Sequence, residues 1–421
     1  MKHKSVKFAI ILLILTLSVA TASQIASASL TSKNVRTWFW TNSTDINSVA
    51  KSDLYGDGKT EIVTGGYYFD GSRAVAQLCV WDGATLALKN VQTWYWGTGN
   101  VVKSVVVGDV DGDGKVEIVT GGYYYDGTRD VAQLCVWDGA TLALKNVKTW
   151  YWTSDTQINS VVVGDVDGDG KLEIVTGGYY YDGTRDVAQL CVWNGATLAL
   201  KNVQTWYWTG NTYLYSVAIG DVDADGKIEI VTGGDYINGN SPSAAQLCVW
   251  NGATLALKNV QTWYWTSSTA IYSVALGDVD ADGKVEIVTG GHYYDGTHEV
   301  AQLCVWNGAT LALKNVQTWY WTSTTYVFSV AVGDVDGDGK VEIVTGGYYY
   351  DGTRYVAQLC LWNGATLALK NVQTWYWGTS STQINSVVVG DVDGDGKVEI
   401  MTGGQYYDGT REVAQLCVWA G

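Results

Sequence analysis

An acidic, glycine-containing phrase recurs seven times along this chain, and it is the part most able to do chemistry. Its second copy runs from Gly108 to Gly122 as GDVDGDGKVEIVTGG. Within nine residues it places four carboxylates: Asp109, Asp111, Asp113 and Glu117. Like charges so close repel one another, and a divalent cation would make the crowding favourable. Alternate spacing in a tight turn points these oxygens inward, and the backbone carbonyl of Lys115 can add another.

Oxygen ligands in a flexible loop favour Ca²⁺, which takes about six to eight oxygens, over Mg²⁺ with its octahedral demand. We expect about six to seven ions, one per repeat, with a weak first site because Tyr55 replaces the middle Asp. The alternative is a solvated Asp-Gly turn without metal. The predicted ligands are Asp53, Asp57, Glu61, Asp109, Asp111, Asp113, Lys115, Glu117, Asp165, Asp167, Asp169, Lys171, Glu173, Asp221, Asp223, Asp225, Lys227, Glu229, Asp278, Asp280, Asp282, Lys284, Glu286, Asp334, Asp336, Asp338, Lys340, Glu342, Asp391, Asp393, Asp395, Lys397 and Glu399.

The elements that position these turns come from the same repeat. The Asp that opens each phrase recurs every 56 or 57 residues, and the seven cysteines and 21 tryptophans keep that step. In the second repeat, four segments rich in Val, Ile, Thr, Tyr and Trp are separated by Gly or Asp: SVVVGDV, VEIVTGGYYY, VAQLCVW and NVKTWYW. Four short strands per repeat of this length predict one blade of a β-propeller.

The chain ends predict how the blades close. The last repeat stops at Gly421 without its fourth strand, whereas residues 33–40, KNVRTWFW, match the fourth strand of the later repeats. A ring can use this offset, and closure removes exposed sheet edges. The sequence therefore predicts an all-β fold, a seven-bladed β-propeller of four-stranded blades in which the N-terminal strand completes the last blade.

This repeat resembles the FG-GAP/VCBS type found in the N-terminal propeller of integrin α-subunits and in secreted microbial proteins. The D-x-D-x-D-G-x-x-[DE] loop before a strand carries the resemblance. It implies calcium ligands at positions 1, 3, 5 and 9 of each loop, with a main-chain oxygen from position 7. Two features depart from the family pattern: Glu stands at position 9 in place of the more usual Asp, and TGGYYY replaces the FG and GAP residues.

The N-terminal segment has the pattern of a secretory signal. Lys2, Lys4 and Lys7 precede an apolar run from Phe8 to Ala20, and small residues follow. We expect a signal peptide over residues 1–28 and a propeller over 29–421, with an uncleaved anchor as the alternative. The protein would then be secreted, extracellular or at the cell surface, with no membrane insertion of the mature domain. A net charge of −16 argues against nucleic acid as a partner.

A partner is expected on the face where the repeats differ. The connections between fourth and first strands vary, whereas the acidic turns and the [ND]GATLAL turns hardly change. Aromatic residues gather on this variable loop face in the middle repeats and are the candidate partner-binding residues: Tyr213, Tyr215, Tyr272, Tyr326 and Phe328. Loops on a rigid scaffold commonly carry recognition, although drift in exposed loops gives the same pattern.

The remaining residue types favour structure over catalysis. The seven cysteines are an odd number at equivalent positions, which predicts buried free thiols. The TWYW and YYY runs recur in the blades and are expected to pack blade against blade. His292 and His298 occur in one repeat, as substitutions and not as a zinc pair.

The sequence agrees to different degrees with three functions. We expect a monomeric, non-enzymatic, calcium-binding adhesion or recognition scaffold with a protein or glycan ligand. The alternative is a calcium-stabilised propeller lectin. A polysaccharide-active enzyme is disfavoured, because the sequence shows no asymmetric set of acid and base residues, and no catalytic residues are predicted.

Overall fold

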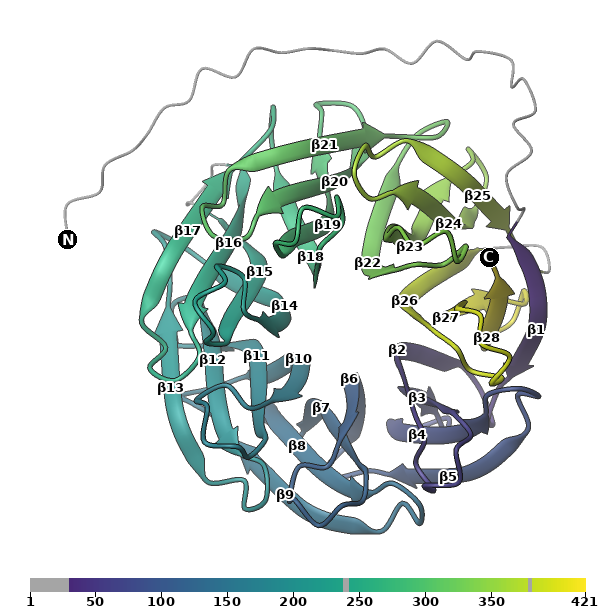
Figure 1. Cartoon of the computed structure of the whole chain (residues 1–421). Coiled ribbons are helices and arrows are strands. Elements are labelled where there is room, and N and C mark those ends of the chain that lie inside the picture. Colours follow the sequence, from purple (N-terminus) through teal and green to yellow (C-terminus); the bar gives the residue numbers. More distant parts are fainter. Residues whose placement is uncertain (1–29, 238–241, 378–380) are drawn as a thin grey trace.

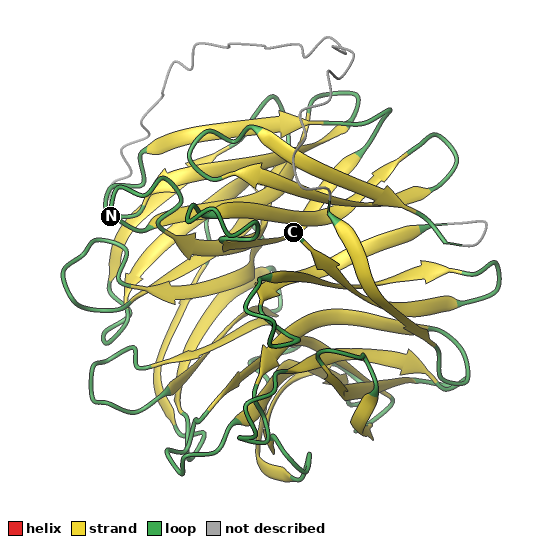
Figure 2. Ribbon diagram, turned by 45° about the vertical axis from the view of Figure 1, so that its right-hand side comes forward, coloured by secondary structure: helices red, strands yellow, loops and turns green. Residues whose placement is uncertain are grey.

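Each repeat folds into one antiparallel sheet because its β-branched and aromatic segments alternate with Asp- and Gly-rich turns. The computed structural model describes residues 30–237, 242–377 and 381–421. These residues form seven four-stranded sheets arranged around a central axis, with strands and loops and no helix among them (Figures 1 and 2). The predicted all-β, seven-bladed propeller is confirmed.

The first two strands of every blade lie toward the axis (Figure 1). The innermost strands are β2 (Thr44–Ser52), β6 (Gly99–Gly108), β10 (Thr156–Gly164), β14 (Thr212–Gly220), β18 (Thr269–Gly277), β22 (Thr325–Gly333) and β26 (Thr382–Gly390). The second strands are β3 (Glu61–Phe69), β7 (Glu117–Tyr125), β11 (Glu173–Tyr181), β15 (Glu229–Ile237), β19 (Glu286–Tyr294), β23 (Glu342–Tyr350) and β27 (Glu399–Tyr407).

The other two strands of each blade complete the sheet toward the rim. The third strands are β4 (Ala74–Asp82), β8 (Asp130–Asp138), β12 (Asp186–Asn194), β16 (Ser243–Asn251), β20 (Glu299–Asn307), β24 (Tyr355–Asn363) and β28 (Glu412–Ala420). The outer strands are β5 (Leu88–Trp94), β9 (Leu144–Trp150), β13 (Leu200–Trp206), β17 (Leu257–Trp263), β21 (Leu313–Trp319), β25 (Leu369–Trp375) and β1 (Thr31–Trp38). Blades one to six follow chain order from β2, and blade seven combines β26, β27 and β28 with β1.

The N-terminal strand closes the ring as the sequence predicted. Strand β1 pairs antiparallel with β28, in a register that joins Val35 to Cys417 and Trp38 to Ala414. Figure 1 shows β1, in purple, beside the yellow strands of the C-terminal blade. Blade seven therefore has the same four-strand order as the other six blades, although its outer strand comes from the opposite end of the chain.

Two hydrogen bonds recur at all seven seams between blades. On the inner strands, the Ser104 hydroxyl accepts the Val161 N–H of the next blade, and the equivalent bonds all measure 3.0–3.1 Å. Farther out, the Trp94 indole donates to the Gln133 side chain of the next blade, and this series spans 2.7–3.2 Å. The seam between blades seven and one contains both bonds, so the ring is closed by the same contacts that join its interior blades.

Every innermost strand contains one β-bulge at the same point in the repeat. Its bulged residue falls between two paired residues, opposite the Gly-Gly of TGG. A Cβ on Gly122 would lie 2.0 Å from the Val101 carbonyl oxygen, and one on Gly121 would lie 2.3 Å from Val161 of the next blade. The TGG sequence is thus required by close backbone approach. The bulged residues are Asn47, Lys103, Asn159, Tyr215, Tyr272, Phe328 and Asn385.

The hydrophobic core lies between blades as well as within them. One cluster joins Ile62 and Trp81 of blade one to Leu416 of blade seven. At the same seam, the ring centroids of Trp38 and Trp81 are 4.5 Å apart, and the other seams repeat this pair at 4.6–4.8 Å. The first Trp of each TW[YF]W motif therefore packs blade against blade, as predicted, whereas the residue after it, such as Tyr95 or Tyr264, is exposed.

The cysteines are buried and free, as predicted. Each lies on a third strand in the sheet interior, and burial raises the pKa of the Cys79 thiol to about 12. These thiols therefore act as small apolar core residues and are poor nucleophiles near neutral pH.

The predicted signal segment, residues 1–28, lies outside the described residues. The boundary between it and the propeller therefore stays a prediction. Within the part of the chain that the structure describes, no helix has the length and apolar character needed to cross a membrane.

Removing residues 29–42 should lower the melting temperature sharply, because blade seven would lose β1 and its seam with blade one. Losing a strand and a Trp–Trp contact should cost more than about 5 kcal/mol, which corresponds to a fall of at least roughly 6 °C for a chain of this size. Differential scanning calorimetry of the truncated chain, beside one lacking residues 1–28, measures the effect. Equal melting curves for the two would refute closure through β1.

Candidate functional site

The acidic turns join each innermost strand to the second strand of its blade, and their first Asp organises the loop. In blade two, Oδ1 of Asp109 accepts the N–H groups of Gly112 and Asp113 at 2.8 and 3.0 Å, and Oδ2 accepts that of Gly114 at 2.9 Å. Gly114 has a φ of +85°, a conformation that favours glycine. The DxDGDG sequence thus encodes a tight turn through its own side-chain to backbone hydrogen bonds.

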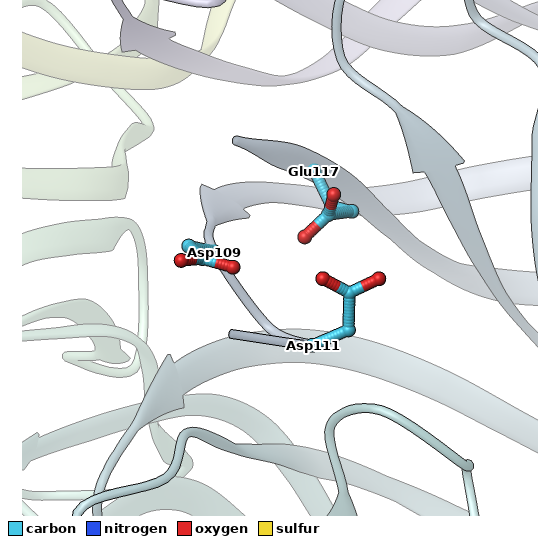
Figure 3. Close-up of side chains that lie close together, drawn as sticks. All are labelled: Asp109, Asp111 and Glu117. Carbon is cyan, nitrogen blue, oxygen red and sulfur yellow. The ribbon is translucent and has the colours of Figure 1, made fainter. Parts of the chain in front are cut away.

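The carboxylates of each turn converge. In Figure 3, the side chains of Asp109, Asp111 and Glu117 point toward a common space at the mouth of the turn. One oxygen from each of these residues lies within 4.8 Å of the others. Comparable groups are Asp165, Asp167 and Glu173; Asp221, Asp223 and Asp225; Asp278, Asp280 and Asp282; and Asp334, Asp336 and Glu342.

The structure brings together three of the four predicted carboxylates in these groups. Positions 1, 3 and 9 converge in blades two, three and six, whereas positions 1, 3 and 5 converge in blades four and five. In blade two, the position-5 residue Asp113 is 43% exposed and accepts the N–H of Lys115 at 2.9 Å. Glu117 is fully buried, and its Oε2 accepts the Val110 N–H at 3.0 Å. Position 9 therefore anchors the turn to the sheet.

A lysine that sequence reasoning missed enters every acidic turn from the outer strand of the same blade. Lys145 Nζ lies 2.8 Å from Glu117 Oε1 and also contacts Asp111 and Asp113. In all seven blades, the equivalent ammonium lies 2.6–2.9 Å from the position-9 glutamate. The lysines are Lys33, Lys89, Lys145, Lys201, Lys258, Lys314 and Lys370. Their signal was present in the sequence as the lysine that precedes NV in every repeat.

This lysine supplies positive charge without a metal ion. Hydrogen bonds to Asp167 and Glu173 raise the pKa of Lys201, so it stays an ammonium. In the first turn, Tyr55 replaces the middle Asp, and the Lys89 ammonium lies 4.3 Å from the Tyr55 ring centroid and 2.6 Å from Glu61. Asp53 still accepts the N–H groups of Gly56, Asp57 and Gly58 there. The turn conformation is therefore kept where the metal ligand set is incomplete.

The turns nevertheless retain oxygens that fit a divalent cation. Oδ1 of Asp223, Oδ1 of Asp280 and Oδ1 of Asp334 are buried without a hydrogen-bond partner. A hard cation such as Ca²⁺ would satisfy these oxygens, and carboxylates are its preferred ligands. The donor set fits calcium, with the lysine ammonium as a competitor for the carboxylates at positions 3 and 9.

The five candidate partner-binding aromatics lie in strands and not in the connections where the sequence placed them. Tyr213 and Tyr215 are in β14, Tyr272 is in β18, and Tyr326 and Phe328 are in β22. Each of these strands begins at a Thr that precedes the aromatic residues. The Thr hydroxyl closes the short connection before the strand: Thr212 Oγ1 accepts the Trp208 N–H at 3.0 Å.

These aromatic side chains form a continuous array across three blades. Ring centroids are 5.4 Å apart for both Tyr215–Tyr272 and Tyr272–Phe328, and 5.7 Å apart for Tyr326–Phe328. Each of the three rings at the bulge position thus contacts the ring in the neighbouring blade. We call Tyr215, Tyr272 and Phe328 the aromatic arc.

His292 lies beside the aromatic arc, and its contacts are to an aromatic ring and a carboxylate. Its ring stacks on Tyr272 at 5.2 Å, and its Nε2 is 3.3 Å from Glu299 Oε2. Burial lowers the pKa of His292 to about 4, so the imidazole is neutral near pH 7. His298 instead stacks on Tyr320 and lies 3.7 Å from Asp295. Both histidine rings therefore pack on neighbouring aromatic rings.

Comparisons with known protein families agree with the fold. Residues 53–120 match the family model described as FG-GAP-like repeat. Residues 158–189 and 326–357 match the model described as FG-GAP repeat. A search of curated protein sequences found no match.

Calorimetric titration of the chelated protein with calcium should show roughly six binding events, one for each turn that keeps all four carboxylates. Calcium should also raise the melting temperature, because it binds the folded turns and not the unfolded chain. Titration without heat, together with an unchanged melting temperature, would refute the metal sites.

Replacing Lys145 with Met should separate the roles of lysine and calcium. In chelator, the change leaves the buried Glu117 without its cation, at a cost of about 3 kcal/mol and a melting temperature lower by roughly 5 °C. Calcium should restore the loss, and the affinity of that one turn should rise about tenfold because a competing charge is gone.

The matched control is Lys115→Met, which alters an exposed lysine of the same turn and leaves its backbone carbonyl in place. This variant should match the parent protein in both buffers. Equal stability of the Lys145→Met protein and the control in chelator would show that the lysine does not neutralise the turn.

Proposed function

Because the chain is an FG-GAP repeat propeller protein, we propose that it acts as a non-enzymatic scaffold for adhesion or recognition. It is secreted or held at the cell surface, works as a monomer, and binds a protein or glycan ligand. Calcium in the acidic turns stabilises the scaffold. The variable face, defined as the end that carries the connections between fourth and first strands and between second and third strands, contacts the ligand.

The observation that carries this proposal is where the seven blades differ. Residues that form the seams and turns repeat in each blade, including the serine next to every bulge. The bulged residue itself changes from Asn to Lys, Tyr or Phe. Bulges redirect a side chain without breaking the sheet, so this position tolerates change that the seams do not.

The bulged residues divide the ring into two unlike halves. On one half, asparagines bond within the protein: the Asn47 amide donates to the Val102 carbonyl at 2.7 Å, and Asn159 donates to Leu214 at 2.9 Å. On the other half is the aromatic arc, whose rings remain partly exposed. A protein that needed only a closed ring could use asparagine at every bulge. The aromatic half therefore favours a recognition role, because aromatic side chains dominate binding surfaces.

The metal sites and the ligand site lie on opposite faces of the ring. Lys145 begins the outer strand and reaches the acidic turn, so the acidic turns and the turns between third and fourth strands share one face. On the opposite face, the Asp130 N–H donates to the Asp155 side chain of the next blade at 2.8 Å. Calcium would therefore act on ligand binding through the stability of the scaffold.

A non-enzymatic role agrees with the packing of the His292–Glu299 pair on the variable face. The His292–Glu299 pair is asymmetric, yet the imidazole is packed between Tyr272 and Tyr326. A base with a pKa near 4 takes up protons poorly at neutral pH. The alternative of a lectin is favoured by a separate observation: a pocket on this face is lined by tyrosine, glutamine and glutamate side chains.

Replacing the aromatic arc residues Tyr272 and Phe328 by Asn should weaken ligand binding at least tenfold, because buried aromatic contacts dominate interface energies. Asparagine already occupies three of the seven bulges, so the double variant should fold. Labelled protein is titrated on a printed array of glycans and extracellular proteins, in calcium and in chelator.

The matched control is Lys103→Asn, which changes a bulge outside the aromatic arc and should keep full binding. Equal losses in both variants would exclude the aromatic arc. Absence of any array binding by the parent protein, or release of soluble sugars from bound glycans, would refute a non-enzymatic recognition scaffold.

A further inference from the structure

A pocket of about 340 Å³ opens on the variable face at the seam between blades six and seven. Its walls come from the start of β24, from Ser381 and the start of β26, and from the end of β27 and the start of β28. The lining residues are Tyr355, Ser381, Gln383, Gln405, Tyr407 and Glu412. The volume lies in the range of small-molecule sites, which begins at about 300 Å³.

The pocket exists because blade seven departs from the repeat. Gln405 stands where four other blades place the first tyrosine of YY[YF], as in Tyr67 and Tyr348. In blade six that tyrosine ring packs against its neighbours, with the centroids of Tyr348 and Tyr355 4.6 Å apart. Glutamine lacks the ring, so blade seven leaves open the volume that a phenol fills elsewhere.

The polar groups of the pocket also lack the partners that their equivalents have. At the seam between blades two and three, the Gln157 amide donates to Asp130 at 2.6 Å. At the next seam, the Tyr213 hydroxyl donates to Asp186 at 2.6 Å. The position of these acids is taken by Tyr355 at the seam before blade seven. Gln383 consequently turns its amide to Asn385, at 3.1 Å.

Asn385 then orients both glutamines and leaves one group of each unused. Its own amide donates to Gln405 Oε1 at 2.7 Å. Among the described residues, no protein group bonds the remaining Gln405 amide nitrogen or the Gln383 carbonyl oxygen. The pocket therefore presents a fixed hydrogen-bond donor beside a fixed acceptor.

Glu412 adds a carboxyl group without a cation. Within the described part of the chain its carboxylate has neither a hydrogen bond nor an ion pair. Partial burial, with the nearby charges of Asp45 and Asp408, raises the pKa of Glu412 to about 7. At the equivalent position of blade five, Glu299 instead lies beside His292. Glu412 is thus an unpaired acid at a half-buried site.

We propose that this pocket binds a saccharide, with Gln383, Gln405 and Glu412 bonding adjacent hydroxyls and Tyr355 packing against the sugar ring. Hydroxyls donate and accept together, which matches a carboxyl, an amide donor and an amide acceptor in one cavity. Tyrosine supplies an apolar face with a polar tip. The inference rests on the proposed recognition function and adds to it a saccharide site on the same face.

The experiment uses the variant Gln405→Tyr, which restores the residue of four other blades and fills the pocket. Saturation-transfer NMR and calorimetry measure binding of methyl pyranosides of neutral hexoses, pentoses and N-acetylated hexosamines to the purified protein. The parent protein should bind at least one glycoside. The Gln405→Tyr protein should bind it at least tenfold more weakly, with an unchanged or higher melting temperature.

A second variant pair isolates the carboxyl group. Glu412→Gln should weaken glycoside binding at least fivefold, whereas Glu299→Gln, at the same repeat position in blade five, should leave it unchanged. Equal affinity of the Gln405→Tyr and parent proteins would overturn the assignment of the pocket. Binding of methylamine but of no glycoside would replace a saccharide with a cationic ligand.

The outcomes also separate this inference from the proposed function. If the parent protein binds array ligands through the aromatic arc and binds no glycoside in the panel, the saccharide pocket is wrong and the recognition scaffold stands. If it binds neither array ligands nor glycosides, both fail.

Discussion

Closure of the ring is the constraint on which the other features of this structure depend. Each blade must turn the chain by the same angle, because an error at any seam would prevent β1 from reaching β28. The seams meet this demand with one repeated pair of contacts, a serine hydroxyl accepting a valine N–H and an indole donating to a glutamine. All seven Ser–Val bonds agree within 0.1 Å, including the one between Ser386 and Val49 across the chain ends. Residues outside these contacts are free to vary, which confines variation to the bulges and to one face.

The acidic turns meet a second constraint, the repulsion among their own carboxylates. A lysine from the outer strand offsets this repulsion, so folding of the blade brings a covalently attached cation to each turn. The acidic turn of blade seven therefore depends on ring closure, because it receives its ammonium from Lys33 on β1. A bound calcium ion would bring twice the charge and could reach oxygens that the lysine leaves unbonded, such as Oδ1 of Asp223. Lysine and calcium therefore bind the same carboxylates. The lysine is always present in the folded chain, whereas calcium binding depends on the calcium concentration.

The sequence predicted those features that a period along the chain can reveal. The four strands per blade, the closing role of residues 33–40 and the buried cysteines all follow from residue type at fixed spacing. The lysine was missed because in six blades it lies 28 or 29 residues from the glutamate it meets, and in blade seven the two are 366 residues apart. Their contact depends on how β9 folds back along β8, so that Lys145 reaches past β8 to the start of β7, which spacing alone does not give. The bulges were missed for a related reason, since a register shift between two strands leaves the pattern of either strand unchanged. This is why Tyr215 and Tyr272 were placed in connections, although they lie at bulges within strands.

The saccharide pocket lies at a seam where blades six and seven depart from the repeat at several adjacent positions. Gln405, Tyr355 and Glu412 each depart from a residue that other blades use to satisfy their neighbours. An unbonded polar group in a half-buried site costs stability, about 1–3 kcal/mol when it is fully buried. Other repeats contain residues that make hydrogen bonds or fill space at these positions, as Tyr67, Asp130 and Asp186 show. Buried polar atoms without a partner also occur in other blades, at Asp45, Asp235 and His292. The pocket differs in that groups of Gln383, Gln405 and Glu412 gather in one cavity, with a donor and an acceptor fixed by Asn385, which is the arrangement expected where local hydrogen bonding has been given up for binding.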